Sequence, residues 1–230
     1  MSAIFSRRAV LVVRLAVLGL LALCVAAVML FVWRARAYEQ LGEPIAQPIP
    51  FSHKHHVGDD GIDCRYCHTT VETDAHAGLP STGVCLSCHS QLYRDQPLLA
   101  QLHQSAAANQ PIAWQRVHVL PDFVYFNHSV HVAKGVACVE CHGRVDQMPL
   151  EWRAQPLQMQ WCLECHRAPE KFVRPRTEIY NLHYEPLADE NLIRQGVPES
   201  QRTQEVQGPK LVAEYHIHKE QMTNCSVCHR

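Results

Sequence analysis

The chain has 230 residues, including 11 cysteines and 16 histidines, far more metal-binding side chains than a plain globular core requires. Its formal net charge is −1, so it has neither the basic field that holds a nucleic acid nor an acidic tail. Composition therefore excludes nucleic-acid partners and directs attention to metal ligation.

The first predicted element is an apolar helix near the N-terminus. Residues 15–33 carry no charge, and a helix of that length, at about 1.5 Å per residue, is about 28 Å long, close to the thickness of a bilayer core. We predict a membrane anchor over residues 1–37, with a transmembrane helix at about 10–33, and a linker over 38–50. A cleaved signal peptide is the alternative, because Ala35-Arg36-Ala37 has the form that signal peptidase accepts, but the apolar run is longer than such segments usually are.

After the anchor, the motif Cys-x-x-Cys-His occurs five times and uses every remaining cysteine. The cysteine pairs are Cys64 and Cys67, Cys85 and Cys88, Cys138 and Cys141, Cys162 and Cys165, and Cys225 and Cys228, and the histidines that follow them are His68, His89, His142, His166 and His229. Zinc ribbons would take the pairs two at a time and leave one over. A dithiol redox centre would need one motif beside a strand-helix-strand pattern, and disulfides do not explain five histidines in register.

Covalent haem c explains every position of the motif. The two thiols form thioethers to one edge of the porphyrin, and the next imidazole reaches the iron. We predict five haems c, with the five motif histidines as proximal ligands. Because haem c is attached after export, residues from about 38 onward are expected on the periplasmic face of the bacterial inner membrane.

An internal repeat precedes the first and third motifs. The stretch "FSHKHHVGDDGIDCRYCH" begins at Phe51 and "FNHSVHVAKGVACVECH" at Phe126, and the second copy has lost one loop residue. A second motif follows each copy. We therefore predict a first dihaem module with its connecting segment over residues 51–125, a second over 126–179, and a C-terminal segment with the fifth haem over 180–230.

The repeated histidines are the predicted distal ligands, because two imidazoles three residues apart on a helical turn diverge enough to reach different irons. They are His53, His56, His128 and His131. For the fifth iron the pattern favours His118, with Met159 in reserve and Met148 and His218 as weaker candidates. We expect the other histidines, His55, His76, His103, His183 and His216, to be solvated or bonded to haem propionates.

The predicted fold is mostly irregular with short α-helices wrapped around five haems, plus the N-terminal transmembrane helix. Residues 96–107 and 187–195 are expected to be short helices. Apolar periodicity elsewhere is short, so the macrocycles are expected to supply the core. The polar residues 180–212 are expected to cover a partner-facing or solvent surface.

The paired F-x-H-x-x-H units resemble those of class III multihaem cytochromes. Together with the anchor, the five motifs, "WQRVHVLPDFVYFNHSVHVAKGVACVECHGRVDQM" and "MQWCLECHR", they resemble the pentahaem, membrane-anchored cytochrome c subunit of bacterial alternative complex III. This resemblance implies electrons that originate from quinol and arrive through an iron-sulfur subunit. It also implies a polytopic quinol-binding subunit, and a monohaem cytochrome c or terminal oxidase as acceptor. It supports His118 and Met159 without separating them.

Three functions compete. The first is an electron relay inside a respiratory complex, in which the chain is not itself an enzyme. The second is a haem enzyme such as a nitrite reductase, but those enzymes place lysine after one Cys-x-x-Cys pair and this chain has none. The third is a stand-alone, membrane-anchored quinol dehydrogenase that feeds a periplasmic reductase, although a single helix leaves little room for a quinol pocket. The sequence favours the relay.

Overall fold

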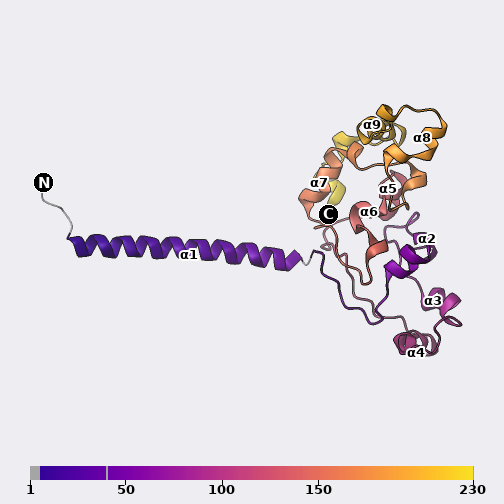
Figure 1. Ribbon diagram of the computed structural model, residues 1–230, viewed down its shortest axis with the longest axis horizontal. Coiled ribbons are helices and arrows are strands. Elements are labelled where there is room, and N and C mark those ends of the chain that lie inside the picture. Colours follow the sequence, from indigo (N-terminus) through magenta and orange to yellow (C-terminus); the bar gives the residue numbers. More distant parts are fainter. Residues whose placement is uncertain (1–5, 40, 230) are drawn as a thin grey trace. The chain divides into compact units, whose positions relative to one another are not determined.

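The computed structural model describes residues 6–39 and 41–229 (Figure 1). Residues 1–5 of the predicted anchor, residue 40 of the predicted linker and residue 230 lie outside the described residues. Of residues 36–39, only the backbone is described. The chain divides into two units, Met1–Leu41 and Gly42–Arg230, and each is treated by itself.

The first unit is a single helix, α1 (Arg7–Glu39). Within its stretch Arg7–Ala35, an 18-residue apolar window has a mean hydropathy of 3.0, and none of that window is buried. By length and composition this helix can cross a membrane, since 29 residues span about 43 Å at the usual helical rise. The predicted helix at about 10–33 is confirmed as a helix, and it continues into the segment predicted as a linker.

The second unit consists of short helices joined by irregular segments (Figure 1). Residues 42–229 form isolated bridges rather than strands, and the longest helix there has 11 residues. The predicted helices at 96–107 and 187–195 are present, each beginning with a 3₁₀ turn at a proline. The elements are η1 (Lys54–Asp59), α2 (Cys64–Cys67), α3 (Thr82–His89), η2 (Pro97–Leu99), α4 (Ala100–Ala108), α5 (His128–Ala133), α6 (Cys138–His142), η3 (Val145–Gln147), α7 (Met159–Arg167), η4 (Pro169–Lys171), η5 (Arg176–Glu178), η6 (Pro186–Ala188), α8 (Glu190–Arg194), η7 (Glu199–Gln201), α9 (Gln204–Glu214), η8 (Lys219–Gln221) and α10 (Cys225–Cys228).

The two copies of the internal repeat fold alike, although the first copy is one residue longer than the second. In the second copy, α5 is an ordinary α-helix, whereas the equivalent turn η1 of the first copy is a π-helix. The turn closes in the same way in both, with Ile62 N–H donating to His56 O at 2.9 Å and Val136 N–H donating to His131 O at 3.0 Å. A π-turn accommodates one extra residue without moving its flanks, so the insertion leaves the histidines in equivalent places.

Buried apolar side chains form two small clusters rather than one large core. The first contains Val145, Met148 and Leu182, and the second contains Val173, Leu211 and Tyr215. Residues 180–212, which were expected to cover a surface, also contribute to this packing, because Leu182 and Leu211 are buried in these clusters. Where apolar residues do not recur at a regular spacing, the sequence pattern does not predict single buried positions such as these.

Helix α9 packs on η4 through a backbone contact that only glycine allows. A Cβ atom at Gly208 would lie 1.9 Å from the carbonyl oxygen of Glu170. The side-chain amide of Gln204 donates to the same carbonyl and to that of Val173. The contact fixes the C-terminal segment to the segment that follows the fourth motif.

The start of the second unit runs beside residues 151–153. Gly42 N–H donates to Arg153 O at 3.0 Å, and Ile45 N–H donates to Glu151 O at 3.2 Å. Pro44 and Trp152 form an isolated antiparallel bridge between these bonds. The segment predicted as a linker therefore holds the backbone of Glu151 in place from Gly42 onward.

Candidate functional site

Each Cys-x-x-Cys pair lies on a single short helix. The five pairs are on α2, α3, α6, α7 and α10, and residues three apart on a helix share one face. All eleven cysteines are free of disulfides, so both thiols of each motif are available on the same side of their helix.

The histidines that follow the first four motifs each face one histidine of the internal repeat. In every case the two ring centres are a little more than 6 Å apart. The pairs are His68 with His53 (6.4 Å), His89 with His56 (6.1 Å), His142 with His128 (6.4 Å) and His166 with His131 (6.2 Å).

This spacing fits one metal ion between two imidazoles. With metal–nitrogen bonds of about 2 Å on both sides, the ring centres of two opposed imidazoles are about 6 Å apart. Each pair also includes a histidine that directly follows two thiols on one helical face. The residues present therefore fit a covalently attached haem at each of these four places.

Backbone carbonyls orient six of these eight imidazoles. A carbonyl only accepts, so the Nδ1 atom must carry the proton and Nε2 keeps its lone pair for a metal. The Nδ1–O distances are 2.8 Å from His56 to Ser52, 2.7 Å from His68 to Gly78, 3.1 Å from His89 to Leu92, 2.9 Å from His128 to Ala75, 2.7 Å from His131 to Asn127 and 3.0 Å from His166 to Met222.

The phenylalanine that opens each repeat supports the histidines after it. Phe51 stacks on His56 at 4.5 Å and meets His53 edge-on at 4.9 Å. Phe126 does the same with His131 at 4.6 Å and His128 at 4.7 Å. This contact explains why the repeat contains the phenylalanine as well as its two histidines.

The two histidines without a carbonyl partner face a carboxylate instead. The oxygens of Glu151 lie 3.7 Å from Nδ1 of His53 and 3.8 Å from Nδ1 of His142. Nδ1 of His118 is nearer, at 3.4 Å. Burial by itself would raise the pKa of Glu151, but the nearby imidazoles of His142, His53 and His118 lower that pKa to about 2. Sequence reasoning missed Glu151, because it belongs to no motif.

The structure places His118, the predicted distal ligand of the fifth iron, beside the histidine of the third motif. Its ring packs edge-on against His142, with centres 4.3 Å apart, whereas the ring beside His229 is that of Phe123 at 5.8 Å. Burial, followed by the nearby His142, lowers the pKa of His118 to about 4, and its Nε2 atom is buried without a hydrogen-bond partner in the described chain.

The remaining candidates for the fifth distal position have different surroundings. Met159 begins α7 with 64% of its surface exposed, and Met148 is 2% exposed within the first apolar cluster. His218 is exposed beside Glu220. Among the histidines expected to be solvated, His183 pairs with Asp146 at 3.2 Å and His55 pairs with Asp60 at 3.5 Å.

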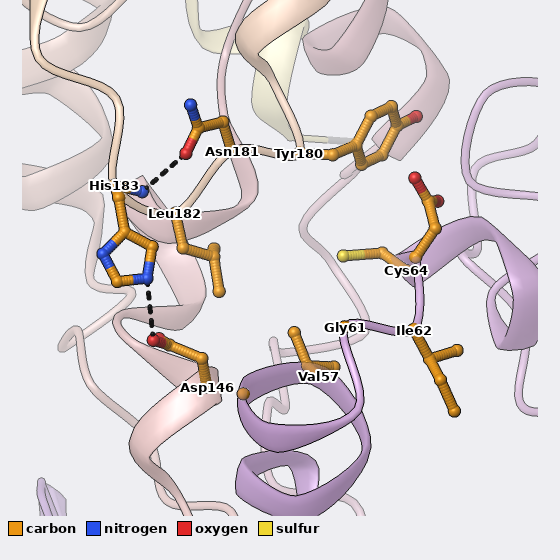
Figure 2. Close-up of a pocket in the computed structure, with 11 residues that line it drawn as sticks. Val57, Gly61, Ile62, Cys64, Asp146, Tyr180, Asn181, Leu182 and His183 are labelled. Carbon is orange, nitrogen blue, oxygen red and sulfur yellow. Dashed lines mark hydrogen bonds and ion pairs between the residues drawn. The ribbon is translucent and has the colours of Figure 1, made fainter.

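A cavity of about 270 Å³ lies next to the first motif. Figure 2 shows the Cys64 sulfur directed into it, with Leu182 and Tyr180 on the lining. His183 and Asp146 close the far side. The cavity therefore places a motif thiol beside a lining that is partly apolar and partly polar.

Thiols of different motifs are electrostatic neighbours in a definite order. The interaction between the Cys64 and Cys138 thiols lowers the pKa of Cys64 and raises that of Cys138. Burial and then the thiols of the neighbouring motif raise three further thiol pKa values. These are Cys67 beside Cys85, Cys141 beside Cys165, and Cys162 beside Cys228. The motifs therefore adjoin in the order second, first, third, fourth, fifth.

Comparison with known proteins agrees with the chemistry of this site. The chain is 38% identical over 105 residues to the multihaem cytochrome c subunit of menaquinone reductase from Nitratidesulfovibrio vulgaris. It is related to a multihaem cytochrome. The match covers 45% of this chain and 49% of the relative, so the chain spans about half the length of that protein. No family model matches the sequence.

Proposed function

We propose that this chain is a pentahaem c-type cytochrome that carries electrons within a quinone-linked membrane complex. The observation that carries the proposal is the set of four imidazole pairs with ring centres 6.1–6.4 Å apart, each adjoining two thiols on one helix. The proposed axial pairs are His68 with His53, His89 with His56, His142 with His128 and His166 with His131. His229 is the proposed proximal ligand of the fifth haem.

A bound haem c supplies reversible one-electron chemistry, and the chain determines where it occurs. The thiols would hold each porphyrin edge, and the paired imidazoles would ligate the iron from both sides at four places. The carbonyl bonds keep six of those imidazoles in one orientation. Four irons held in this way would offer no open position to a substrate, so we propose a relay rather than an enzyme.

The repeat brings haems together in pairs. His53 and His56 belong to one turn but face the first and second motifs, and His128 and His131 face the third and fourth. With the order of the thiols, this supports an electron path from the second motif through the first, third and fourth to the fifth. Either end of the path is then the place to exchange electrons with a partner.

For the complex itself we propose an assembly like alternative complex III, anchored by α1 in the inner membrane with the haem unit on the periplasmic face. The proposed partners are an iron-sulfur subunit, a polytopic quinol-binding subunit, and a monohaem cytochrome c or terminal oxidase. The relative's name gives a second candidate, in which electrons run through the same relay toward menaquinone.

The first experiment counts haems. Full-length protein, expressed with a haem c maturation system, is measured by pyridine haemochrome and by mass spectrometry after denaturation. We expect five covalent haems. An unmodified chain, or one that binds zinc, would contradict the proposal.

The second experiment separates the complexes. Tagged protein is purified from native membranes and its companions are identified. Reduction of cytochrome c by quinol, with iron-sulfur and multispanning subunits present, supports the first assembly, and menaquinone reduction by reduced cytochrome supports the second. Quinol oxidation by the chain alone would instead support the stand-alone dehydrogenase.

A further inference from the structure

Glu151 lies outside every motif, yet its carboxylate faces imidazoles that belong to two different haem sites. One oxygen is 3.7 Å from Nδ1 of His53, and the other is 3.8 Å from Nδ1 of His142. His53 opposes His68 at the first site, and His142 opposes His128 at the third. A single side chain therefore adjoins an axial ligand on each side of the junction between the two modules.

The contact is unlike those of the other proposed ligands. The remaining six present Nδ1 to a neutral backbone carbonyl, whereas His53 and His142 present it to a carboxylate. At 3.7 and 3.8 Å these contacts are longer than hydrogen bonds, and Nδ1 of His53 has no hydrogen-bond partner in the described chain. Glu151 therefore acts through its charge: a half-buried carboxylate beside an axial ligand stabilises the ferric iron over the ferrous and lowers the reduction potential.

The surrounding chain holds Glu151 in this position. Its carbonyl accepts from Ile45 N–H, and Trp152, the next residue, bridges to Pro44 and packs on the apolar cluster of Met148. The side chain is only 23% exposed, and Nδ1 of His118 lies 3.4 Å from the same carboxylate oxygen that His142 faces. The carboxylate is thus fixed on both flanks, and water has little access to it.

A separate metal site at this cluster is the competing explanation. Donor atoms of His118, His142 and Glu151 lie within 4.8 Å of one another. However, a neutral imidazole has one lone pair, and the ring of His142 faces that of His128 at 6.4 Å, where the proposed haem iron would use that lone pair. The cluster of His118, His142 and Glu151 is therefore better explained as a carboxylate beside imidazoles than as a second metal site.

We propose that Glu151 is a positioning residue that acts through its charge on His53 and His142 together and holds the potentials of the first and third haems low. This inference rests on the proposed function, since it requires those histidines to ligate iron. It makes the junction between the two modules a place where one charge tunes two electron carriers.

The test compares Glu151→Gln with Glu170→Gln in the full-length protein. Glu170 is a suitable control because its side chain is 28% exposed and it pairs with Lys219 instead of an imidazole. Each protein is titrated potentiometrically while its haem absorbance is followed. We expect two of the five one-electron steps to move to higher potential in Glu151→Gln, and none in Glu170→Gln.

The haem count distinguishes the two levels of the proposal. Fewer than five haems in the unaltered protein would overturn the proposed function. Five haems together with an unchanged Glu151→Gln titration, or with a uniform shift of all five steps, would overturn only the role of Glu151. If Glu151→Gln does not accumulate with five haems, Glu151→Asp is titrated instead. It should give a smaller upward shift confined to two steps, and no shift, or a shift of other steps, would overturn the role.

Discussion

The thiols of Cys64 and Cys138 are electrostatic neighbours, although they belong to the first and third Cys-x-x-Cys-His motifs. The two modules therefore meet through their first motifs. The second motif is left at one end, and the fifth adjoins the fourth through Cys162 and Cys228. The order of motifs in space thus differs from their order in the chain.

This order predicts which motif interrupts the relay. Replacing Cys225 and Cys228 by serine should remove one haem from an end of the path and leave reduction of the other four at an unchanged rate. Replacing Cys64 and Cys67 should remove one haem from the interior and separate the second motif from the rest. Stopped-flow reduction by a small donor checks this, and equal rates in the two variants would contradict the order.

Two neighbouring histidines allow a controlled test of the proposed axial ligands. His56 faces His89 at 6.1 Å, whereas His55 pairs with Asp59 and Asp60 at the surface. We expect His56→Ala to open one iron, so that the reduced protein binds one equivalent of carbon monoxide at that site. His55→Ala should bind no more than the unaltered protein. Difference spectra measure both, and equal binding in the two variants would refute the assignment.

The surroundings of the methionines make a thioether ligand unfavourable. Met159 is 64% exposed, and Met148 is enclosed among apolar side chains. We expect the near-infrared spectrum of the oxidised protein to lack the histidine/methionine signature, and Met159→Ala to leave that spectrum unchanged. A thioether band that disappears in Met159→Ala would identify Met159 as the fifth distal ligand instead.

Replacing glycine by alanine is expected to change the free energy of unfolding in opposite directions at two positions. Gly208→Ala would place its Cβ 1.9 Å from the Glu170 carbonyl oxygen, and such overpacking should reduce the free energy of unfolding by about 1–3 kcal/mol. Gly83 lies in helix α3 with its nearest neighbour atom at 3.7 Å. Gly83→Ala should therefore be neutral or stabilise by up to about 1 kcal/mol. Urea unfolding followed by haem absorbance compares the two, and equal midpoints would be inconsistent with the packing of α9.

Tyr184 predicts a loss of stability at alkaline pH. Burial, and then the hydrogen bond that its hydroxyl donates to Asp189 at 2.9 Å, raise the pKa of Tyr184 above its ordinary value. An unfolded tyrosine loses its proton near pH 10, earlier than the folded one. The stabilisation is therefore complete below about pH 10 and is lost as pH rises toward the folded pKa. Unfolding free energies at neutral and alkaline pH should fall less steeply in Tyr184→Phe, and identical slopes would exclude this contribution.

Much of the site could be predicted from the sequence because covalent attachment and repeats are local. A haem c needs two thiols and an imidazole at fixed spacing, so the five motifs between Cys64 and His229 predict attachment sites from the sequence alone. The repeat that begins at Phe51 and Phe126 likewise indicated four further ligands, and the uncharged residues 15–33 predicted α1. None of these inferences required knowledge of which segments meet.

Only the tertiary structure decided which residues face each other across a distance. It paired His56 with His89 and His131 with His166, placed His118 against His142, and brought Glu151 to imidazoles of two modules. It also buried Leu182 and Leu211 in a stretch whose polar composition suggested surface. Such contacts join residues far apart in the chain, and they depend on how short helices pack together, which spacing and periodicity along one segment do not encode.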